Sequence, residues 1–390
     1  MRTTSRTRVG AVAVAAATAL FAAACGSSDS SSTSSTSPSA TPSQQQATGS
    51  TGLSQAKATV DASLANPSGI LLDTALSKKP PTGKYVITVE TPVPVTKVRD
   101  DAFAEAAKVF GWRYERIVPG SGPEDYGNAL TQAISKHPDA IHVSGTPLSL
   151  LKTQLDQAKA QNIPVVSESV GGAFDPPVIS NSLDGDDQVA AWGKMVASYV
   201  VVNSGGKANV ALFTIKAFPI LGVFVDSFKS TLSSTCPACS VKEVNQQLAD
   251  LGTKTPSSVV STIQQDPKIN WAIFTFGDLS LGVDAALKGA GLNGKVNVGG
   301  ETPSQANLAA LKDGTESVWT GFSAPILGWR LADMLARHFN GDDLAAANKV
   351  LLPTQLITKD NVSSVPLDST GYYVGFPGYQ DAFKKLWQAQ

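Results

Sequence analysis

The sequence predicts an α/β protein made of two domains, each with a doubly wound parallel sheet. Residues 270–302 show the pattern well, because apolar runs at 271–276 and 296–298 flank a helical repeat of leucine and alanine. Strands that are apolar on both faces are typical of a parallel sheet covered by helices, so this stretch is predicted to be one strand–helix–strand unit. Such patterns alternate about ten times, which is too many strands for one tidy open sheet. A chain of 390 residues is also long enough for two sizeable cores.

The individual strands and helices follow from the same periodicities. Short apolar runs predict strands at 85–89, 112–117, 140–143, 163–166, 209–213, 241–244, 271–276, 296–298 and 318–320. Apolar residues three or four positions apart, such as Phe103, Ala106 and Phe110, are typical of helices. Helices are predicted at 100–110, 125–135, 148–160, 189–202, 224–232, 257–265, 281–290 and 324–339. A short amphipathic helix at 379–387 is expected to return to the surface within a C-terminal extension, 362–390.

Residues 1–24 are predicted to be a lipoprotein signal peptide. Three arginines precede an apolar stretch at 9–24, which has the length of a signal-peptide core and is short for a membrane span. The small residues before Cys25 resemble the lipobox of bacterial lipoproteins, which implies cleavage before Cys25 and acylation of its sulfur and new amino group. Two or more acyl chains give stable anchoring. An ordinary signal peptide followed by an incidental cysteine is the alternative.

The segment between the signal peptide and the first strand has two parts. Residues 25–52 are predicted to be a disordered tether, because serine, threonine, glutamine, proline and alanine dominate and too little apolar surface is available to fold. Residues 53–83 begin with a weak helical pattern that Asn66-Pro67 ends. We expect them to form an N-terminal strap that lies on the first domain.

Five short segments between residues 84 and 362 carry a family resemblance. They are Asn162-Ile-Pro-Val-Val166, Gly205-Gly-Lys-Ala-Asn209, Phe274-Thr-Phe-Gly-Asp278, Val298-Gly-Gly-Glu301 and Asp313-Gly314. Their order and spacing resemble the ribose-binding family of type I periplasmic binding proteins, the sugar-type substrate-binding proteins of bacterial ABC transporters. The resemblance implies two α/β domains joined by a three-strand hinge and a cleft that closes over a ligand.

The resemblance also implies the domain boundaries. The chain would cross between the domains near 182–187, near 322 and near 348–350. The first domain would be 84–184 plus 323–348, and the second would be 185–322 plus 349–361.

Four carboxylates follow predicted strands: Glu90, Glu168, Asp278 and Glu301. Ligands of open parallel sheets bind beyond the carboxyl ends of the strands, so we expect a cleft here with Asp278 and Glu301 side by side. Strand-end acids also cap the following turn or helix, which is the alternative, particularly for Glu90 and Glu168. A general acid–base pair would be the catalytic alternative. The sequence offers no set of nucleophile, base and orienting residue, so we predict no catalytic residue and no enzyme.

The resemblance and the aromatic residues add further ligand contacts. By position they are Thr91, Ser169, Phe224, Phe276 and Phe322. Core packing is the alternative for the aromatic residues. This cleft supplies carboxylates but few amides and no mapped arginine, so ribose specificity does not carry over. We expect a neutral or cationic ligand with more apolar surface than ribose.

The few cysteines and histidines predict no metal site and no cofactor. Cys236 and Cys239 are separated by two residues, and no further soft ligands for zinc lie nearby. The pair follows a predicted helix, whereas a thioredoxin-like site would start one. We therefore predict a small local disulfide. The three histidines are scattered along the chain.

Together these features predict a lipid-anchored solute-binding protein on the extracytoplasmic face of the plasma membrane, in the cell envelope. It would be a monomer that delivers a small ligand to an ABC transporter permease. A sensory binding protein that presents its ligand to a membrane receptor is the alternative. A regulator of related fold would need a helix-turn-helix where this chain has a signal sequence. The formal net charge of −1 argues against nucleic acid as a partner.

Overall fold

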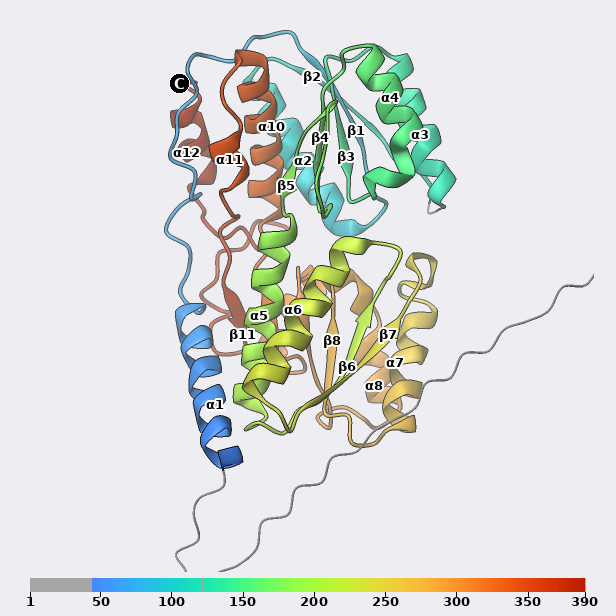
Figure 1. The fold of residues 1–390 in the computed structure, drawn as a ribbon, viewed down its shortest axis with the longest axis vertical. Coiled ribbons are helices and arrows are strands. Elements are labelled where there is room, and N and C mark those ends of the chain that lie inside the picture. Colours follow the sequence, from blue (N-terminus) through green and yellow to red (C-terminus); the bar gives the residue numbers. More distant parts are fainter. Residues whose placement is uncertain (1–43, 121, 390) are drawn as a thin grey trace, which may run out of the picture. The chain divides into compact units, whose positions relative to one another are not determined.

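The computed structural model describes residues 44–120 and 122–389 (Figure 1). These residues form two lobes, each built on a mostly parallel sheet with helices on both faces. This arrangement confirms the predicted two-domain α/β class. The predicted signal peptide and Cys25 lie outside the described residues.

The first lobe contains a parallel five-stranded sheet in the order β2-β1-β3-β4-β5. Its strands are β1 (Tyr85–Val89), β2 (Arg113–Ile117), β3 (Ala140–Ser144), β4 (Val165–Glu168) and β5 (Val178–Leu183). Its helices are α2 (Pro94–Val109), α3 (Pro123–Ser135), α4 (Lys152–Ala160), α10 (Ala324–Asn340) and α11 (Ala345–Asn348), with a short 3-10 turn, η1 (Leu148–Leu151). Side chains alternate across the strands, so Ile87 packs with Leu130 of α3 whereas Val86 belongs to the cluster of Phe103 on α2. Both faces of the sheet are therefore covered.

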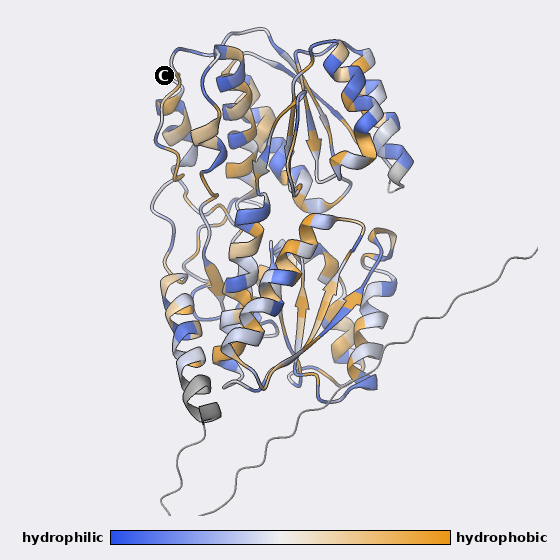
Figure 2. Cartoon of the chain, in the orientation of Figure 1, coloured by the Kyte–Doolittle hydropathy of each residue, from blue (hydrophilic) through white to orange (hydrophobic). Residues whose placement is uncertain are grey.

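The second lobe contains a six-stranded sheet in the order β11-β10-β9-β8-β6-β7, in which only the β10–β11 pair is antiparallel. Its strands are β6 (Asn209–Thr214), β7 (Ser240–Asn245), β8 (Trp271–Phe274), β9 (Asn297–Glu301), β10 (Val318–Thr320) and β11 (Leu356–Thr358). Its helices are α5 (Asp186–Asn203), α6 (Pro219–Thr235), α7 (Lys254–Gln265), α8 (Val283–Gly289) and α9 (Gln305–Asp313), with the turns η2 (Leu248–Asp250) and η3 (Gly277–Ser280). Strands β6 and β8 are largely hydrophobic in Figure 2, and their apolar residues are divided between two core clusters.

The chain passes between the lobes three times: between β5 and α5, between β10 and α10, and between α11 and β11. Both β4 and β9 extend further than predicted, so Glu168 and Glu301 are the last residues of their strands. Two strands fall outside the predicted set. The polar residues Ser180 and Asn181 interrupt the apolar pattern of β5, and β11 is only three residues long.

The N-terminal segment differs from the prediction. Helix α1 spans Gln44–Ala62, so it includes part of the predicted 25–52 tether. It packs on α5 and α6 of the second lobe rather than on the first lobe, as Figure 1 also shows. A Cβ on Gly52 would lie 2.3 Å from the carbonyl oxygen of Thr235, so the helices approach closely there. Beyond α1 the strap reaches the first lobe, where Leu76 N donates to Leu386 O over 2.9 Å.

The C-terminal extension is part of the core. Helix α12 (Tyr379–Leu386) buries Phe383, and the following Trp387 stacks on Trp329 of α10 with ring centroids 5.0 Å apart. The helix thus covers the first lobe with an aromatic face, which is more than the surface position expected for it.

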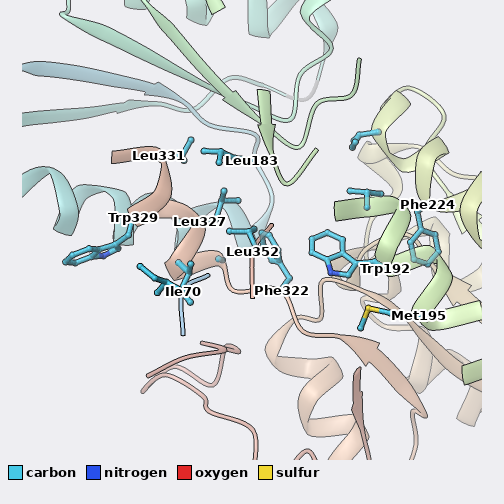
Figure 3. Packing of buried hydrophobic residues seen from close by; sticks show 14 of the residues in the cluster. Ile70, Leu183, Trp192, Met195, Phe224, Phe322, Leu327, Trp329, Leu331 and Leu352 are labelled. Carbon is cyan, nitrogen blue, oxygen red and sulfur yellow. The ribbon is translucent and has the colours of Figure 1, made fainter. Parts of the chain in front are cut away.

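The largest apolar cluster is continuous through the region where the chain passes between the lobes. It includes Leu183 beside the first passage, Phe322 in the second and Leu352 in the third (Figure 3). Trp192 of α5 meets Phe322 edge to face, with ring centroids 5.8 Å apart. The passages are therefore packed segments and not loose linkers.

Candidate ligand-binding site

A cavity of about 130 Å³ is lined by residues of both lobes. Its walls begin where strands end, since Ser144 ends β3, Glu168 ends β4 and Glu301 ends β9. The cavity therefore lies where ligands of open parallel sheets bind. The first lobe supplies most of the polar wall. The second supplies most of the apolar wall: Val189, Trp192, Phe218, Ile220, Leu221, Leu248, Phe276 and Phe322.

A buried guanidinium organises the polar wall. Arg99 of α2 is 2% exposed, and its Nε donates to Asp100 Oδ1 over 2.7 Å. Its Nη1 donates to Ser144 Oγ over 2.8 Å and to a carboxylate oxygen of Glu168. Burial alone would raise the pKa of Glu168, but Arg99 and the nearby His142, whose Nε2 lies 3.6 Å from Glu168 Oε1, lower that pKa to about 2. Glu168 is therefore ionised.

Two further carboxyl groups in the cavity form no ion pair with the described residues. Asp184 follows β5, and burial together with the charge of Glu168 raises its pKa well above the usual range. Burial and the nearby Asp184 likewise raise the pKa of Glu301. Asp184 Oδ1, Glu301 Oε2 and Arg99 Nη2 are buried without a hydrogen-bond partner among the described residues. Such atoms cost free energy until a partner reaches them.

Three residues that line this cavity hold a left-handed backbone without being glycine. The φ angles are +51° for Ser169, +59° for Asp184 and +50° for Thr302. Such conformations cost about 1–3 kcal/mol each and cluster at functional sites. The three residues therefore hold strained backbone conformations at the cavity, and this strain lowers the stability of the fold.

Six of the predicted ligand contacts line the cavity: Thr91, Glu168, Ser169, Phe276, Glu301 and Phe322. Their contact with a ligand stays a prediction.

The other three predicted contacts, Glu90, Phe224 and Asp278, are not among the residues that line this cavity, and their contact with a ligand stays a prediction. Phe224 is fully buried in the core and stacks on Phe228; in the view of Figure 3, Trp192 lies between it and Phe322. Glu90 follows β1 and lies 3.7 Å from Arg116 Nη1, and burial together with Asp100 raises its pKa to about 7.

Asp278, unlike Glu301, is not among the residues that line the cavity. It lies in η3, and its Oδ2 accepts a hydrogen bond of 3.3 Å from the backbone N of Val95 in the first lobe. Burial raises its pKa to about 6. Its observed contact is between the lobes.

Arg99 and Asp184 are site residues that the sequence reading missed. The expectation of a cleft without arginine is wrong, because Arg99 lines the cavity. A signal was available, since Arg99 precedes Phe103 by four positions and so shares the buried face of its helix. Asp184 had the weaker signal of lying at a predicted crossing. Trp192 packs against Phe322 and also lines the cavity.

The remaining features add no second chemistry to the described residues. Cys236 and Cys239 form a disulfide after α6, away from the cavity. In residues 44–120 and 122–389, no group of histidine, cysteine, aspartate and glutamate is arranged to hold a metal ion. No helix in the described part of the chain is long and apolar enough to cross a membrane.

Solved structures with the same fold include several solute-binding proteins. A sugar ABC transporter protein from Yersinia enterocolitica is 18% identical, with a TM-score of 0.67 over 79% of this chain and 93% of that chain. A solute-binding protein from Thermotoga lettingae in complex with 5-methylthioribose is 16% identical, with a TM-score of 0.66 over 81% and 100%. One from Agrobacterium vitis with bound allitol is 19% identical, with a TM-score of 0.62 over 72% and 97%.

The comparison with curated protein sequences finds no match. The family model described as a periplasmic binding protein domain matches residues 96–343, which include most of both sheets and most of the cavity wall. The chain therefore belongs to the periplasmic binding protein family.

Proposed function

We propose that this protein binds a small solute outside the cytoplasm and delivers it to the permease of an ABC importer. The observation that carries the proposal is the cavity between the lobes, in which buried polar atoms of Arg99, Asp184 and Glu301 await partners. The solute is sugar-like or another neutral or cationic small molecule. The solved structures of the same fold that hold allitol or 5-methylthioribose support this ligand class.

Closure of the two lobes is the proposed mechanism. A ligand that touches both walls binds the closed form more tightly than the open form, which shifts the population toward closure. The hydrogen bond from Val95 N to Asp278 joins the lobes and would form only on closure. The permease then recognises the closed form.

Anchoring through Cys25 is part of the proposal. The tether that leads from Cys25 to α1 would hold a monomeric binding protein at the extracytoplasmic face of the plasma membrane. Cys25→Ser is expected to remove lipidation and release the protein from the membrane fraction. Cys236→Ser is the control, because its cysteine lies in the folded part. Unchanged fractionation and migration of Cys25→Ser would contradict the anchor.

A thermal-shift screen across sugars, polyols, amines and aromatic compounds tests ligand binding. A true ligand at 100 times its Kd raises the free energy of unfolding by about 2.7 kcal/mol. Uptake of that compound by cells with and without the gene then separates import from sensing. A screen in which no compound shifts the melting temperature would contradict solute binding, and unchanged uptake in the deletion strain would contradict import.

A further inference from the structure

We propose that the ligand carries an ammonium group, which binds against the carboxylates of Asp184 and Glu301 while an apolar or ring-shaped body lies on the aromatic wall. This inference rests on the proposed solute-binding function and specifies the chemical class of the solute.

The charges of the cavity wall favour a cation. Glu168, Asp184 and Glu301 all line the cavity, and Arg99 is the only basic residue among the lining residues. The positive charge of Arg99 is already shared between Asp100 and Glu168. Asp184 and Glu301 therefore face the cavity without a positive partner among its lining residues.

The burial of the two carboxyl groups makes this imbalance costly. Asp184 is 6% exposed and Glu301 is 2% exposed, and each has one oxygen without a hydrogen-bond partner among the described residues. A buried carboxylate is stable only when it is paired and hydrogen-bonded. An ammonium group supplies both the positive charge and up to three N–H donors. A hydroxyl supplies one donor but no positive charge, and an anionic group adds repulsion.

Counting protons at Ser169 shows how the ligand-free site avoids that cost. Ser169 Oγ lies within hydrogen-bond distance of an oxygen of Glu168 and 2.6 Å from Asp184 Oδ2. A serine hydroxyl carries one proton, so it can donate to only one of these carboxyl groups. Glu168 is ionised, so it accepts the hydrogen bond that the Ser169 hydroxyl donates. The Asp184 contact then requires a proton on Asp184, which donates to Ser169 Oγ.

The proton on Asp184 predicts a coupling between binding and proton release. The charged groups that act on Asp184 are Glu168 on β4, which favours protonation, and Arg99 on α2, which opposes it. The charged group that acts on Glu301 is Asp184 itself, which favours its protonation. Asp186, at the start of α5, is turned toward the backbone N of Gly172, which donates to it over 2.9 Å. An arriving ammonium replaces the proton as the positive partner, so binding releases protons and strengthens as the pH rises, until the ligand amine itself loses its charge.

Isothermal titration calorimetry on the purified protein tests the proposal with two matched sets of probes. One set is tyramine, its neutral alcohol 4-(2-hydroxyethyl)phenol and the acid 3-(4-hydroxyphenyl)propanoate. The other set is D-galactosamine and D-galactose. We expect an amine to bind at least about tenfold more tightly than its neutral counterpart, since a hydrogen bond to a charged group contributes about 1.5–3 kcal/mol. We also expect its binding heat to differ between Tris and phosphate buffers by the amount that proton release requires.

Isosteric variants test the two carboxylates. Asp184→Asn and Glu301→Gln are each expected to weaken amine binding about tenfold or more and to reduce proton release. Glu316→Gln is the matched control, because Glu316 is a buried carboxyl group of the second lobe outside this cavity. It should leave amine binding and proton release unchanged. Circular dichroism checks folding, and the buffer comparison on the unmodified protein does not depend on any variant.

The outcomes separate this inference from the proposed function. Binding of a neutral sugar or alcohol as tightly as its amine would overturn the ammonium proposal and leave solute binding standing. Amine binding without a buffer-dependent heat, or with full affinity in both amide variants, would overturn the assignment to Asp184 and Glu301. Failure of these probes and of every compound in the thermal-shift screen would contradict both proposals.

Discussion

Two buried carboxyl groups, Glu168 in the first lobe and Glu316 in the second, have pKa values shifted in opposite directions. In the first lobe Arg99 pairs with Glu168, so burial does not prevent ionisation and the pKa falls to about 2. In the second lobe Glu316 is buried to a similar degree, but its partners are the neutral donors of Asn307 and Trp319. Burial and the charge of Asp284 raise its pKa to about 8. The guanidinium of Arg99 thus keeps Glu168 ionised, whereas Glu316 has no guanidinium beside it and its pKa is raised.

This contrast suggests a division of labour across the cleft. The first lobe presents a polar wall whose charges are largely paired before the ligand arrives. The second lobe presents apolar surface and the unpaired Glu301. The first wall would orient a polar group, and the second would add burial when the lobes close.

The largest expected effect comes from breaking the pairing in the first lobe. Arg99→Met leaves Asp100 and Glu168 buried without their cation, and breaking a buried ion pair costs about 3–5 kcal/mol. Urea unfolding should show a loss of that order. Lys97→Met on the same helix is the control, because its ion pair with Asp101 is exposed and should matter by less than about 1 kcal/mol. Equal losses in both variants would mean that the buried network does not hold this lobe together.

The next effect is a pH dependence of the free energy of unfolding. The contributions of Glu316 and Glu168 to it have opposite signs. The raised pKa of Glu316 means that the folded protein keeps a proton that the unfolded chain releases above its ordinary pKa of 4.5. That stabilisation is lost as the pH rises through about 8. Since each pKa unit corresponds to about 1.4 kcal/mol, the difference between 4.5 and about 8 predicts a loss of roughly 3–4 kcal/mol between about pH 5 and pH 8. The lowered pKa of Glu168 acts in reverse, so its stabilisation is lost as the pH falls from 4.5 through about 2.

Melting temperatures of the ligand-free protein across this pH range give the measurement. Glu316→Gln should reduce the fall in melting temperature toward pH 8. It should leave the fall in melting temperature at acid pH unchanged. Substituting the exposed Asp61 by asparagine should alter neither limb. If stability instead rises steadily to pH 8, the second-lobe carboxyl groups are ionised and the contrast between the lobes is absent.

A smaller effect is expected at the apolar wall. Phe322→Ala removes an aromatic ring from the cavity, and lost burial should weaken binding of the best compound from the screen by about 1–3 kcal/mol. Calorimetry measures the change. Phe174→Ala is the control, since that ring is partly exposed and outside the cavity lining. Full affinity in Phe322→Ala would place the ligand on another wall.

The smallest effect concerns the contact between the lobes. Asp278→Ala removes the acceptor for Val95 N, a hydrogen bond that contributes about 1 kcal/mol to the closed form. Small-angle scattering of the ligand-free protein should show a larger mean radius of gyration. Asp284→Ala, in the same lobe but bonded to Thr315 within it, should leave the curve unchanged. An unchanged curve for Asp278→Ala as well would show that this bond does not influence closure.

The sequence predicts the fold better than the site for a physical reason. A parallel strand such as β8 is apolar on both faces and bounded by a glycine, so its own residues identify it. The role of Arg99 arises from contacts with Ser144 and Glu168, which lie 45 and 69 positions further along the chain. Phe224 and Phe276 show the same difficulty, because both are aromatic and only the packing decides which one reaches the cavity.

The attachment of α1 has a mechanical consequence for a membrane-anchored protein. Because α1 packs on α5 and α6, a tether that starts at Cys25 meets the folded body at the second lobe. If Cys25 anchors the protein as proposed, that lobe would be the fixed end and the first lobe would be the moving arm. The strap from Ser63, which accepts from Leu356 N over 2.6 Å, to Leu76 bridges fixed end and arm beside the three crossings. The strap would be a fourth connection between the lobes, which limits how far the first lobe can move relative to the second.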